Sequence, residues 1–405
     1  MPGIGIGWRA SARLGAAIVT VGALTTTAVA AAAAPVRHPG LGTGRVVTAG
    51  SAAAARQLLP APMRAIPKLT DRQLAGQRVI YSYLGLRPPA RLLYLIRHGE
   101  AAGVIFFSGN ISSAAQIASV TKELQQADAS SLNPVRLPLL LMTDQEGGNV
   151  RRLPGAPAMS EKQIGQAAHP AVQARAAGTG AAANLHAAGL NVNLAPVLDV
   201  YRTAGNFIDQ FGRSYSRNPD KVSYLGVDFI KTQQAGGVAA TAKHFPGLGA
   251  AARNQDTDAA PVTLNLAAST IRGVDELPYE AAIAAGVKLI MVSWAIYPSL
   301  DGIHPAGVSI PIVQGELRQR LGYGGVTITD ALEAGGLRSF GSIGNRARLA
   351  ARAGMDLLLC AAQTVGEGVH ALDELQSDYA DGKLSGPVFR ASVSRILALR
   401  ATLPG

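Results

Sequence analysis

Cysteine is almost missing from this chain of 405 residues, which contains only Cys360. A single thiol cannot form an internal disulfide, so the fold depends on a hydrophobic core. The hydrophobic content of 48% fits a globular protein, and a chain of this length can bury a sizeable core. Cys360 lies in an apolar run that begins at Met355, which predicts a small buried side chain rather than a nucleophile.

Features of several other protein classes are also missing. The seven histidines are scattered without the close spacing of zinc ligands, and no Gly-x-Ser-x-Gly turn marks a serine nucleophile. No dense Lys/Arg run and no basic patch with interleaved aromatic residues supports nucleic-acid binding. The sequence therefore predicts no metal, no cofactor and no nucleic-acid partner.

The amino-terminal segment has the composition of a secretory signal peptide. Arg9 and Arg13 precede an apolar, alanine-rich run that ends in small residues near Ala34. A transmembrane anchor is the alternative, but a span needs about 20 strongly apolar residues, and alanine is only weakly apolar. We expect a signal peptide at 1–34, removed on export, and a flexible Ala/Pro/Gly-rich tether at 35–68, which leaves no stable membrane span.

The net charge of +11 leaves a strongly basic protein after the leader is removed. A basic exported protein is attracted to polyanions, and the obvious one is the cell wall, which predicts a secreted or cell-wall-associated protein. The alternative is that the basic residues are spread over the surface and only keep molecules apart from one another. The sequence leaves the oligomeric state open.

Residues 69–405 alternate between short apolar runs and alanine-rich segments with helical spacing. This order predicts an α/β fold, and eight such units favour a single (β/α)8 TIM-type barrel domain. An open doubly wound sheet is the alternative, but the segment that follows the first run is not the glycine-rich phosphate turn expected there. The predicted strands are 79–83, 103–107, 137–143, 190–195, 237–242, 288–293, 325–329 and 356–360, and the predicted helices include 114–127, 171–188, 221–234 and 345–353.

Polar residues come directly after several predicted strands, where a barrel of this type places its chemistry. Asp330 closes one strand, a position that suits a carboxylate nucleophile, with a helix N-cap as the alternative. Asp144 follows another strand, and Arg152 is close enough to fold back, so this pair suits either sugar hydroxyls or a structural salt bridge. Lys243 and His244 add a cation and an imidazole at a third strand end.

Five segments together resemble motifs of glycoside hydrolase family 3, in particular its single-domain bacterial β-N-acetylglucosaminidases. They are 144–152, 194–199, 211–215, 243–249 and 328–332, in the order of the family's motifs. The resemblance implies a retaining mechanism with Asp330 as the nucleophile. It also implies a subsite that holds the terminal sugar and is lined by Asp144, Arg152, Arg213, Lys243 and His244.

One loop departs from the family pattern. The usual proton donor of these enzymes is a histidine held by an aspartate two residues earlier, and counting without gaps from Lys243 places them at Asp256 and Asn254. A carboxyl group can replace imidazole if its pKa is raised, so Asp256 is the expected acid/base residue. Asp258 is the alternative, and loss of the role is a third reading. The second histidine of the family loop is Leu248 here.

The expected function is a secreted retaining glycoside hydrolase that removes terminal β-linked N-acetylglucosamine from peptidoglycan- or chitin-derived glycosides. The expected partner is therefore a carbohydrate. The alternatives are a β-glucosidase or β-xylosidase of the same family, or a catalytically weak sugar-binding protein of the cell wall. Trp294 stands where these enzymes often have a histidine, and it is a candidate to stack on a sugar face.

Overall fold

Eight parallel strands close into a barrel in this computed structural model, which describes residues 68–405. Around the barrel the order is β1-β10-β9-β8-β7-β6-β3-β2. The predicted (β/α)8 barrel is therefore confirmed, whereas the predicted signal peptide and all of the predicted tether except residue 68 lie outside the described residues. The barrel strands are β1 (Val79–Tyr81), β2 (Gly103–Ile105), β3 (Leu140–Thr143), β6 (Val192–Asn193), β7 (Ala239–Phe245), β8 (Leu289–Val292), β9 (Val326–Ala331) and β10 (Leu357–Leu359).

Two strands run further than the sequence pattern predicts. Strand β7 continues to Phe245 and β9 continues to Ala331, whereas the other six observed strands lie inside their predicted ranges. Lys243, His244 and Asp330 are consequently part of the barrel wall. Hydrogen bonding to the neighbouring strands fixes their backbone, which is a firmer support than a connecting loop.

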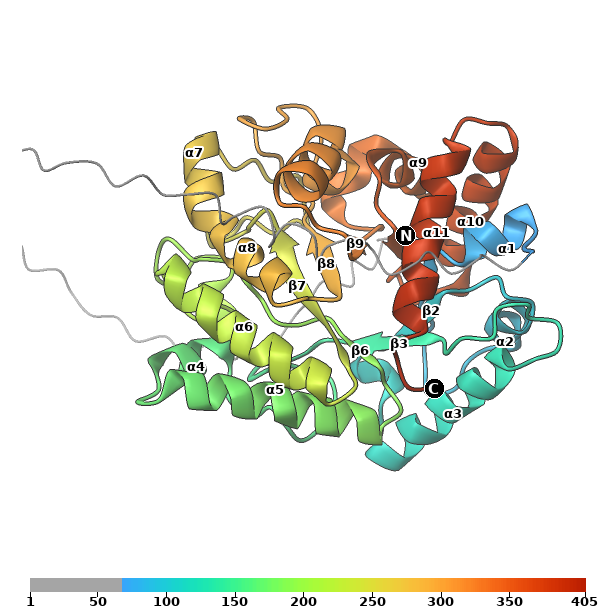
Figure 1. The fold of residues 1–405 in the computed structure, drawn as a ribbon, viewed down its shortest axis with the longest axis horizontal. Coiled ribbons are helices and arrows are strands. Elements are labelled where there is room, and N and C mark those ends of the chain that lie inside the picture. The colour runs from blue at the N-terminus through green and yellow to red at the C-terminus, as the bar shows by residue number, and fades with distance from the viewer. Residues whose placement is uncertain (1–67) are drawn as a thin grey trace, which may run out of the picture. The chain divides into compact units, whose positions relative to one another are not determined.

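Helices surround the barrel, and their ends follow ordinary capping chemistry (Figure 1). Ser113 begins α3 by accepting a hydrogen bond from the backbone N–H of Gln116, and Gly354 ends α9 with φ of 99°, a conformation that favours glycine. The helices are α1 (Asp71–Gly76), α2 (Ala90–Arg97), α3 (Ala114–Asp128), α4 (Glu161–Gln166), α5 (Pro170–Ala187), α6 (Pro219–Ala235), α7 (Ala268–Thr270), α8 (Leu277–Ala284), α9 (Ile343–Ala353), α10 (Val365–Ala380) and α11 (Gly386–Arg400).

Shorter elements complete the chain between these helices and strands. A two-stranded antiparallel hairpin, β4 (Gln145–Gly147) with β5 (Val150–Arg151), follows β3 directly. The remaining helical turns are η2 (Ser108–Asn110), η3 (Asp209–Phe211), η4 (Ile271–Asp275), η5 (Ala306–Val308), η6 (Pro311–Arg320) and η7 (Gly335–Phe340). Within the range 68–405, no helix has both the length and the apolarity that crossing a bilayer needs.

The hydrophobic core has two layers, one inside the barrel and one between the barrel and its helices. Side chains alternate between the two layers along each strand, so Ile80 points inward while Val79 and Tyr81 pack under the helices. Ile396 and Leu399 of α11 join the inner layer, and Figure 1 shows α11 crossing in front of the strands. Truncating such a fully buried aliphatic side chain to alanine typically costs about 2–5 kcal/mol.

An ion cluster closes the amino-terminal end of the barrel. Asp356, just before β10, receives hydrogen bonds from Arg318 at 2.6 Å and from Arg395 at 2.7 Å. Arg78, just before β1, donates to the backbone carbonyl oxygens of Met355 and Asp356. Burial acts to raise the pKa of Asp356, but the two arginine charges outweigh it and lower the pKa to about 2. The cluster therefore has a structural role far from the carboxyl ends of the strands.

Candidate active site

The strands that carry the predicted site residues have register shifts at those residues. Between β7 and β8 the register advances by three residues from Ala242 to Phe245, while the partner strand advances by two. A similar shift occurs in β9 between Ile328 and Ala331, on either side of Asp330. An extra residue in a strand re-aims the side chains beside it, and such bulges are common at barrel rims next to active sites.

Four charged side chains form a compact ion-pair network, here called the paired cluster. The Lys243 ammonium lies 2.8 Å from the Asp144 carboxylate and 2.7 Å from the Glu146 carboxylate. Arg213 grips Glu146 with two parallel hydrogen bonds of 2.9 and 2.8 Å. Arg152 lies at the edge, with its guanidinium 3.7 Å from Asp144. The paired cluster comprises Asp144, Glu146, Arg213 and Lys243.

Charge balance keeps the paired cluster ionised although it is buried. Burial acts to raise the pKa of Glu146, but the nearby charges of Arg213 and Lys243 dominate and lower it to about 2. Burial likewise acts to lower the pKa of Lys243, but Asp144 and Glu146 raise it above its ordinary value. The cluster is thus a fixed array of hydrogen-bonding charges at neutral pH, which suits recognition of hydroxyl groups.

His244 is held next to the paired cluster by Asp199, which is fully buried. The Asp199 carboxylate lies 2.8 Å from Nδ1 of His244 and also accepts the backbone N–H of Leu248 at 2.7 Å. Arg213 lies 3.4 Å from Nε2 of His244, and a guanidinium can only donate. The imidazole proton therefore lies on Nδ1, directed at Asp199, which fixes the ring orientation.

Asp330 is half-buried on β9, with its backbone fixed by the strand. Its carboxylate oxygen Oδ1 accepts a hydrogen bond of 2.8 Å from the backbone N–H of Ala331. The indole N–H of Trp294 donates to the carbonyl oxygen of the same Ala331 at 2.8 Å. The segment that carries Asp330 is thus held on two sides, as a positioned carboxylate requires.

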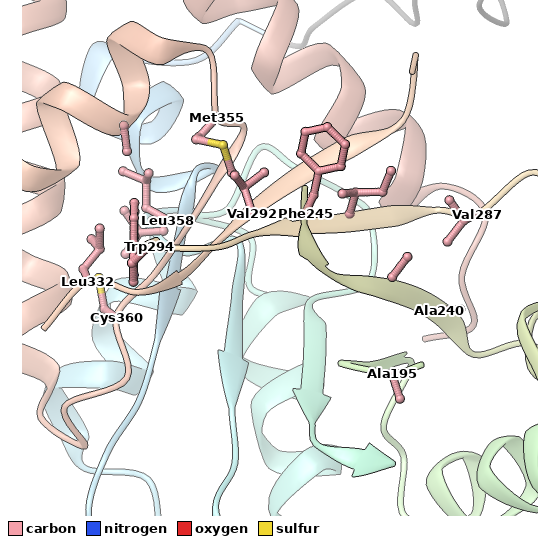
Figure 2. Close-up of a cluster of buried hydrophobic side chains, with 14 of the residues drawn as sticks. Ala195, Ala240, Phe245, Val287, Val292, Trp294, Leu332, Met355, Leu358 and Cys360 are labelled. Atoms are coloured by element: carbon pink, nitrogen blue, oxygen red, sulfur yellow. The ribbon is translucent and has the colours of Figure 1, made fainter. Parts of the chain in front are cut away.

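Trp294 cannot stack on a sugar, because its side chain is completely buried. It belongs to the same hydrophobic cluster as Leu332 and Cys360 (Figure 2). A Cβ atom on Gly307 would lie 2.4 Å from its ring, so the packing there is tight. The sequence-based interpretation of Trp294 as a stacking face is therefore wrong. The residue instead supports the segment around Asp330 from within the core, through its hydrogen bond to Ala331. Cys360, fully buried as well, matches its prediction.

Three acidic side chains near the end of β9 lie close enough to affect one another's charge, and they are here called the carboxyl cluster: Asp258, Asp330 and Glu333. Burial is the main cause that raises the pKa of Asp258 well above its ordinary value, and the negative charge of Asp330 is the next. Burial and the neighbouring Glu367 raise the pKa of Glu333 to about 9. Among residues 68–405, no group of three or more His, Cys, Asp or Glu side chains is arranged to hold a metal ion.

The family model of the glycosyl hydrolase family 3 N-terminal domain matches residues 72–399 of this chain. The chain belongs to glycoside hydrolase family 3. This agrees with the barrel, with the motif order and with polar residues gathered at the carboxyl ends of separate strands.

The chain is similar in sequence to curated relatives and in both sequence and fold to a solved structure. An uncharacterized secreted glycosyl hydrolase of Arthroderma benhamiae is 47% identical over 329 residues, which are 81% of this chain and 93% of that protein. A β-hexosaminidase of Thioalkalivibrio sulfidiphilus is 35% identical over 65% of this chain and 75% of its own. A family 3 β-N-acetylglucosaminidase structure from Paenibacillus superposes with a TM-score of 0.78 at 35% identity, and the alignment covers 84% of this chain but 64% of that longer one.

Most of the family 3 site residues predicted from the sequence come together in the structure. Asp144, Arg152, Lys243, Arg213 and His244 form one connected set of contacts. The sequence places Glu146 and Asp199 after predicted strands and inside motifs that carry the family resemblance, but it assigns neither of them a role. Their importance arises from pairing across 67 and 45 residues of sequence, which spacing along the chain does not reveal.

Proposed function

We propose that this family 3 protein is a retaining β-N-acetylhexosaminidase that removes terminal β-linked N-acetylglucosamine. The observation that carries the proposal is the juxtaposition, at one end of one barrel, of a fixed ionic cluster and a carboxylate on a strand. The relatives support the sugar, because a β-hexosaminidase and a β-N-acetylglucosaminidase are each 35% identical to the chain.

In this proposal the paired cluster, together with Arg152 and His244, holds the terminal sugar. Arg152 and Arg213 have the most exposed side chains of this set, at 16% and 11%, so their guanidinium groups are the ones that a sugar hydroxyl reaches first, and Asp144 follows at 5%. Lys243 and Glu146 lie deeper and keep the outer groups in place. Ionised partners make hydrogen bonds roughly twice as strong as neutral ones, which suits a ligand without charge.

Asp330 acts in the proposal as the nucleophile. Its carboxylate oxygen forms a bond to the anomeric carbon while the bond from that carbon to the leaving oxygen breaks, and the leaving oxygen takes a proton from an acid on the opposite side. Water then attacks the anomeric carbon and releases the Asp330 carboxylate, and the former acid accepts the water proton. Two displacements restore the original configuration, so the product is the β-anomer.

The natural substrate we propose is a peptidoglycan- or chitin-derived fragment outside the cell. The support is the signal-peptide pattern at 1–34, the net charge of +11, and the secreted relative of Arthroderma benhamiae. A basic protein is attracted to the anionic surface on which such fragments are released.

The test is an assay of residues 35–405 on para-nitrophenyl β-N-acetylglucosaminide, β-glucoside and β-xyloside, with the product anomer followed by proton NMR. We expect turnover of the N-acetylglucosaminide well above that of the other two, with the β-anomer formed first. Preferential turnover of the glucoside or xyloside would overturn the sugar assignment, and an α-anomer would overturn the retaining mechanism. No turnover of any aryl glycoside would favour a sugar-binding protein instead.

A further inference from the structure

The loop that follows β7 contains two aspartates that could supply a proton, and their carboxyl groups have different surroundings in the structure. Asp256 is the residue that counting along the family motif selects, and Asp258 lies two positions later. The two aspartates are distinguished by the attachment of the loop, by the hydrogen bonds of each carboxyl group and by the charges near Asp258.

The loop is attached to the segment that carries the nucleophile. The backbone N–H groups of Gly335 and Gly336 donate to the carbonyl oxygens of Asp258 and Thr257, both at 2.8 Å. A Cβ atom on Gly335 would lie only 2.2 Å from the carbonyl oxygen of Ala259, so this approach depends on glycine. The residues around Asp258 are therefore held against η7, the turn that begins a few residues after Asp330.

The carboxylate of Asp256 makes a hydrogen bond within its own loop. Its Oδ1 atom accepts the backbone N–H of Asp258 at 2.9 Å, which is the hydrogen bond of an Asx turn. The backbone carbonyl of the same residue accepts the N–H groups of Ala259 and Ala260 at 3.2 and 3.0 Å. Asp256 thus shapes the turn that presents Asp258.

Asp258 lies close enough to the proposed nucleophile and to other acidic groups to be affected by their charges. Burial is the largest cause that raises the pKa of its carboxyl group, and the negative charges of Asp330, Asp256 and Glu333 add to it in that order. Arg213, in the paired cluster, opposes them weakly. Burial and these acidic groups together raise the pKa of Asp258 well above its ordinary value, which favours the protonated carboxyl group that a general acid needs.

We propose that Asp258, and not Asp256, is the general acid and base of this enzyme. It gives its proton to the leaving oxygen as the Asp330 carboxylate bonds to the anomeric carbon, and it later takes the proton of the attacking water. This inference rests on the proposed function, because it assigns a role within that reaction.

The electrostatic contact with Asp330 also explains how one residue can serve both steps. When Asp330 forms the glycosyl ester it loses its negative charge, and the largest charge effect on Asp258 disappears. The pKa of Asp258 then falls, so the carboxyl group that began as an acid becomes a carboxylate able to act as a base. Release of Asp330 by water restores its charge and with it the protonated state of Asp258.

The experiment compares Asp258→Asn with the matched variant Asp256→Asn, whose amide oxygen still accepts the N–H of residue 258. Each is assayed on aryl β-N-acetylglucosaminides with a poor leaving group (phenyl) and a good one (dinitrophenyl), with and without azide. For Asp258→Asn we expect turnover of the phenyl glycoside to fall by roughly 10²–10⁴-fold. With the dinitrophenyl glycoside we expect a burst, slow turnover, and acceleration by azide with formation of the β-glycosyl azide.

Asp256→Asn is expected to stay within a few-fold of the wild type on both substrates, without an effect of azide. The pH profile adds a second readout, since the alkaline limb of kcat/KM should be lost in Asp258→Asn only. Leaving-group dependence and azide rescue in Asp256→Asn, or their absence in Asp258→Asn, would overturn the assignment. If the wild type prefers another aryl glycoside, the same comparison on that glycoside still tests Asp258, which separates this inference from the choice of sugar.

Discussion

The paired cluster and the carboxyl cluster lie at the same end of one barrel, and both contain carboxyl groups. The pKa values of these groups are nevertheless shifted in opposite directions. In the paired cluster two cations lower the pKa of Glu146 to about 2. In the carboxyl cluster burial and neighbouring acids raise the pKa of Asp258 and of Glu333. Carboxylates paired with cations form a rigid ionic surface that suits binding. Carboxyl groups without such pairing keep a proton more tightly, which suits proton transfer in catalysis.

The largest effect should come from replacing Asp330, the proposed nucleophile, in the carboxyl cluster. Asp330→Asn keeps an oxygen that accepts the N–H of Ala331, so the local backbone should be preserved, but an amide does not attack the anomeric carbon. We expect kcat to fall by roughly 10⁴-fold or more on every aryl glycoside, without loss of stability. Steady-state kinetics and thermal unfolding measure the two quantities. Near wild-type turnover would mean that another group is the nucleophile.

A second substitution tests whether the paired cluster is balanced as described. Glu146→Gln leaves Lys243 and Arg213 buried with one carboxylate fewer between them. Breaking a buried ion pair in this way typically costs about 3–5 kcal/mol, so we expect a loss of that size in the free energy of unfolding and a higher KM. Denaturant unfolding measures the first and kinetics the second.

The matched control for this loss lies in the carboxyl cluster. Asp258→Asn replaces a carboxyl group, which burial and neighbouring acids disfavour in its ionised form, with a neutral amide of the same size, so the free energy of unfolding should stay the same or increase while activity falls. If Asp258→Asn destabilised the protein as much as Glu146→Gln, the contrast between the two clusters would be wrong.

The barrel could be predicted from the sequence, whereas the division into two clusters could not. Apolar runs at regular intervals identify strands because burial on both faces demands them. The bulges at Lys243 and Asp330 lie beyond those runs, where the apolar pattern ends and only hydrogen bonding to neighbours defines the strand. Counting along a motif selects Asp256 over Asp258, because it ignores that the Asp256 carboxylate folds back on its own loop.

Opposite pH dependences of stability should distinguish the clusters. Glu146 has a folded-state pKa of about 2, below its ordinary value of 4.5, so its contribution to stability is present above pH 4.5 and is lost as pH falls toward 2. Glu333 has a folded-state pKa of about 9, above 4.5, so unfolding releases its proton and its contribution is lost as pH rises from 4.5 to 9.

Denaturant unfolding at a series of pH values tests this contrast. Glu333→Gln should flatten the decline of stability above pH 4.5, which we expect to be about 1 kcal/mol per pH unit, and should leave the acidic side unchanged. Glu146→Gln should flatten the acidic side alone. Glu367 and Asp258 also titrate next to Glu333, so part of the decline should remain in the variant. An unchanged profile in Glu333→Gln would show that this residue does not hold the proton.

The smallest effect should come from Trp294, whose indole N–H supports the backbone next to Asp330. Trp294→Phe removes the indole hydrogen bond to the carbonyl oxygen of Ala331 while keeping an aromatic ring in the core. We expect a loss of about 1–2 kcal/mol in stability and a modest decrease in kcat, because the backbone next to Asp330 gains freedom. KM should not change, since the buried ring does not reach the sugar. A raised KM with unchanged kcat would instead indicate a stacking role and would contradict the burial of this side chain.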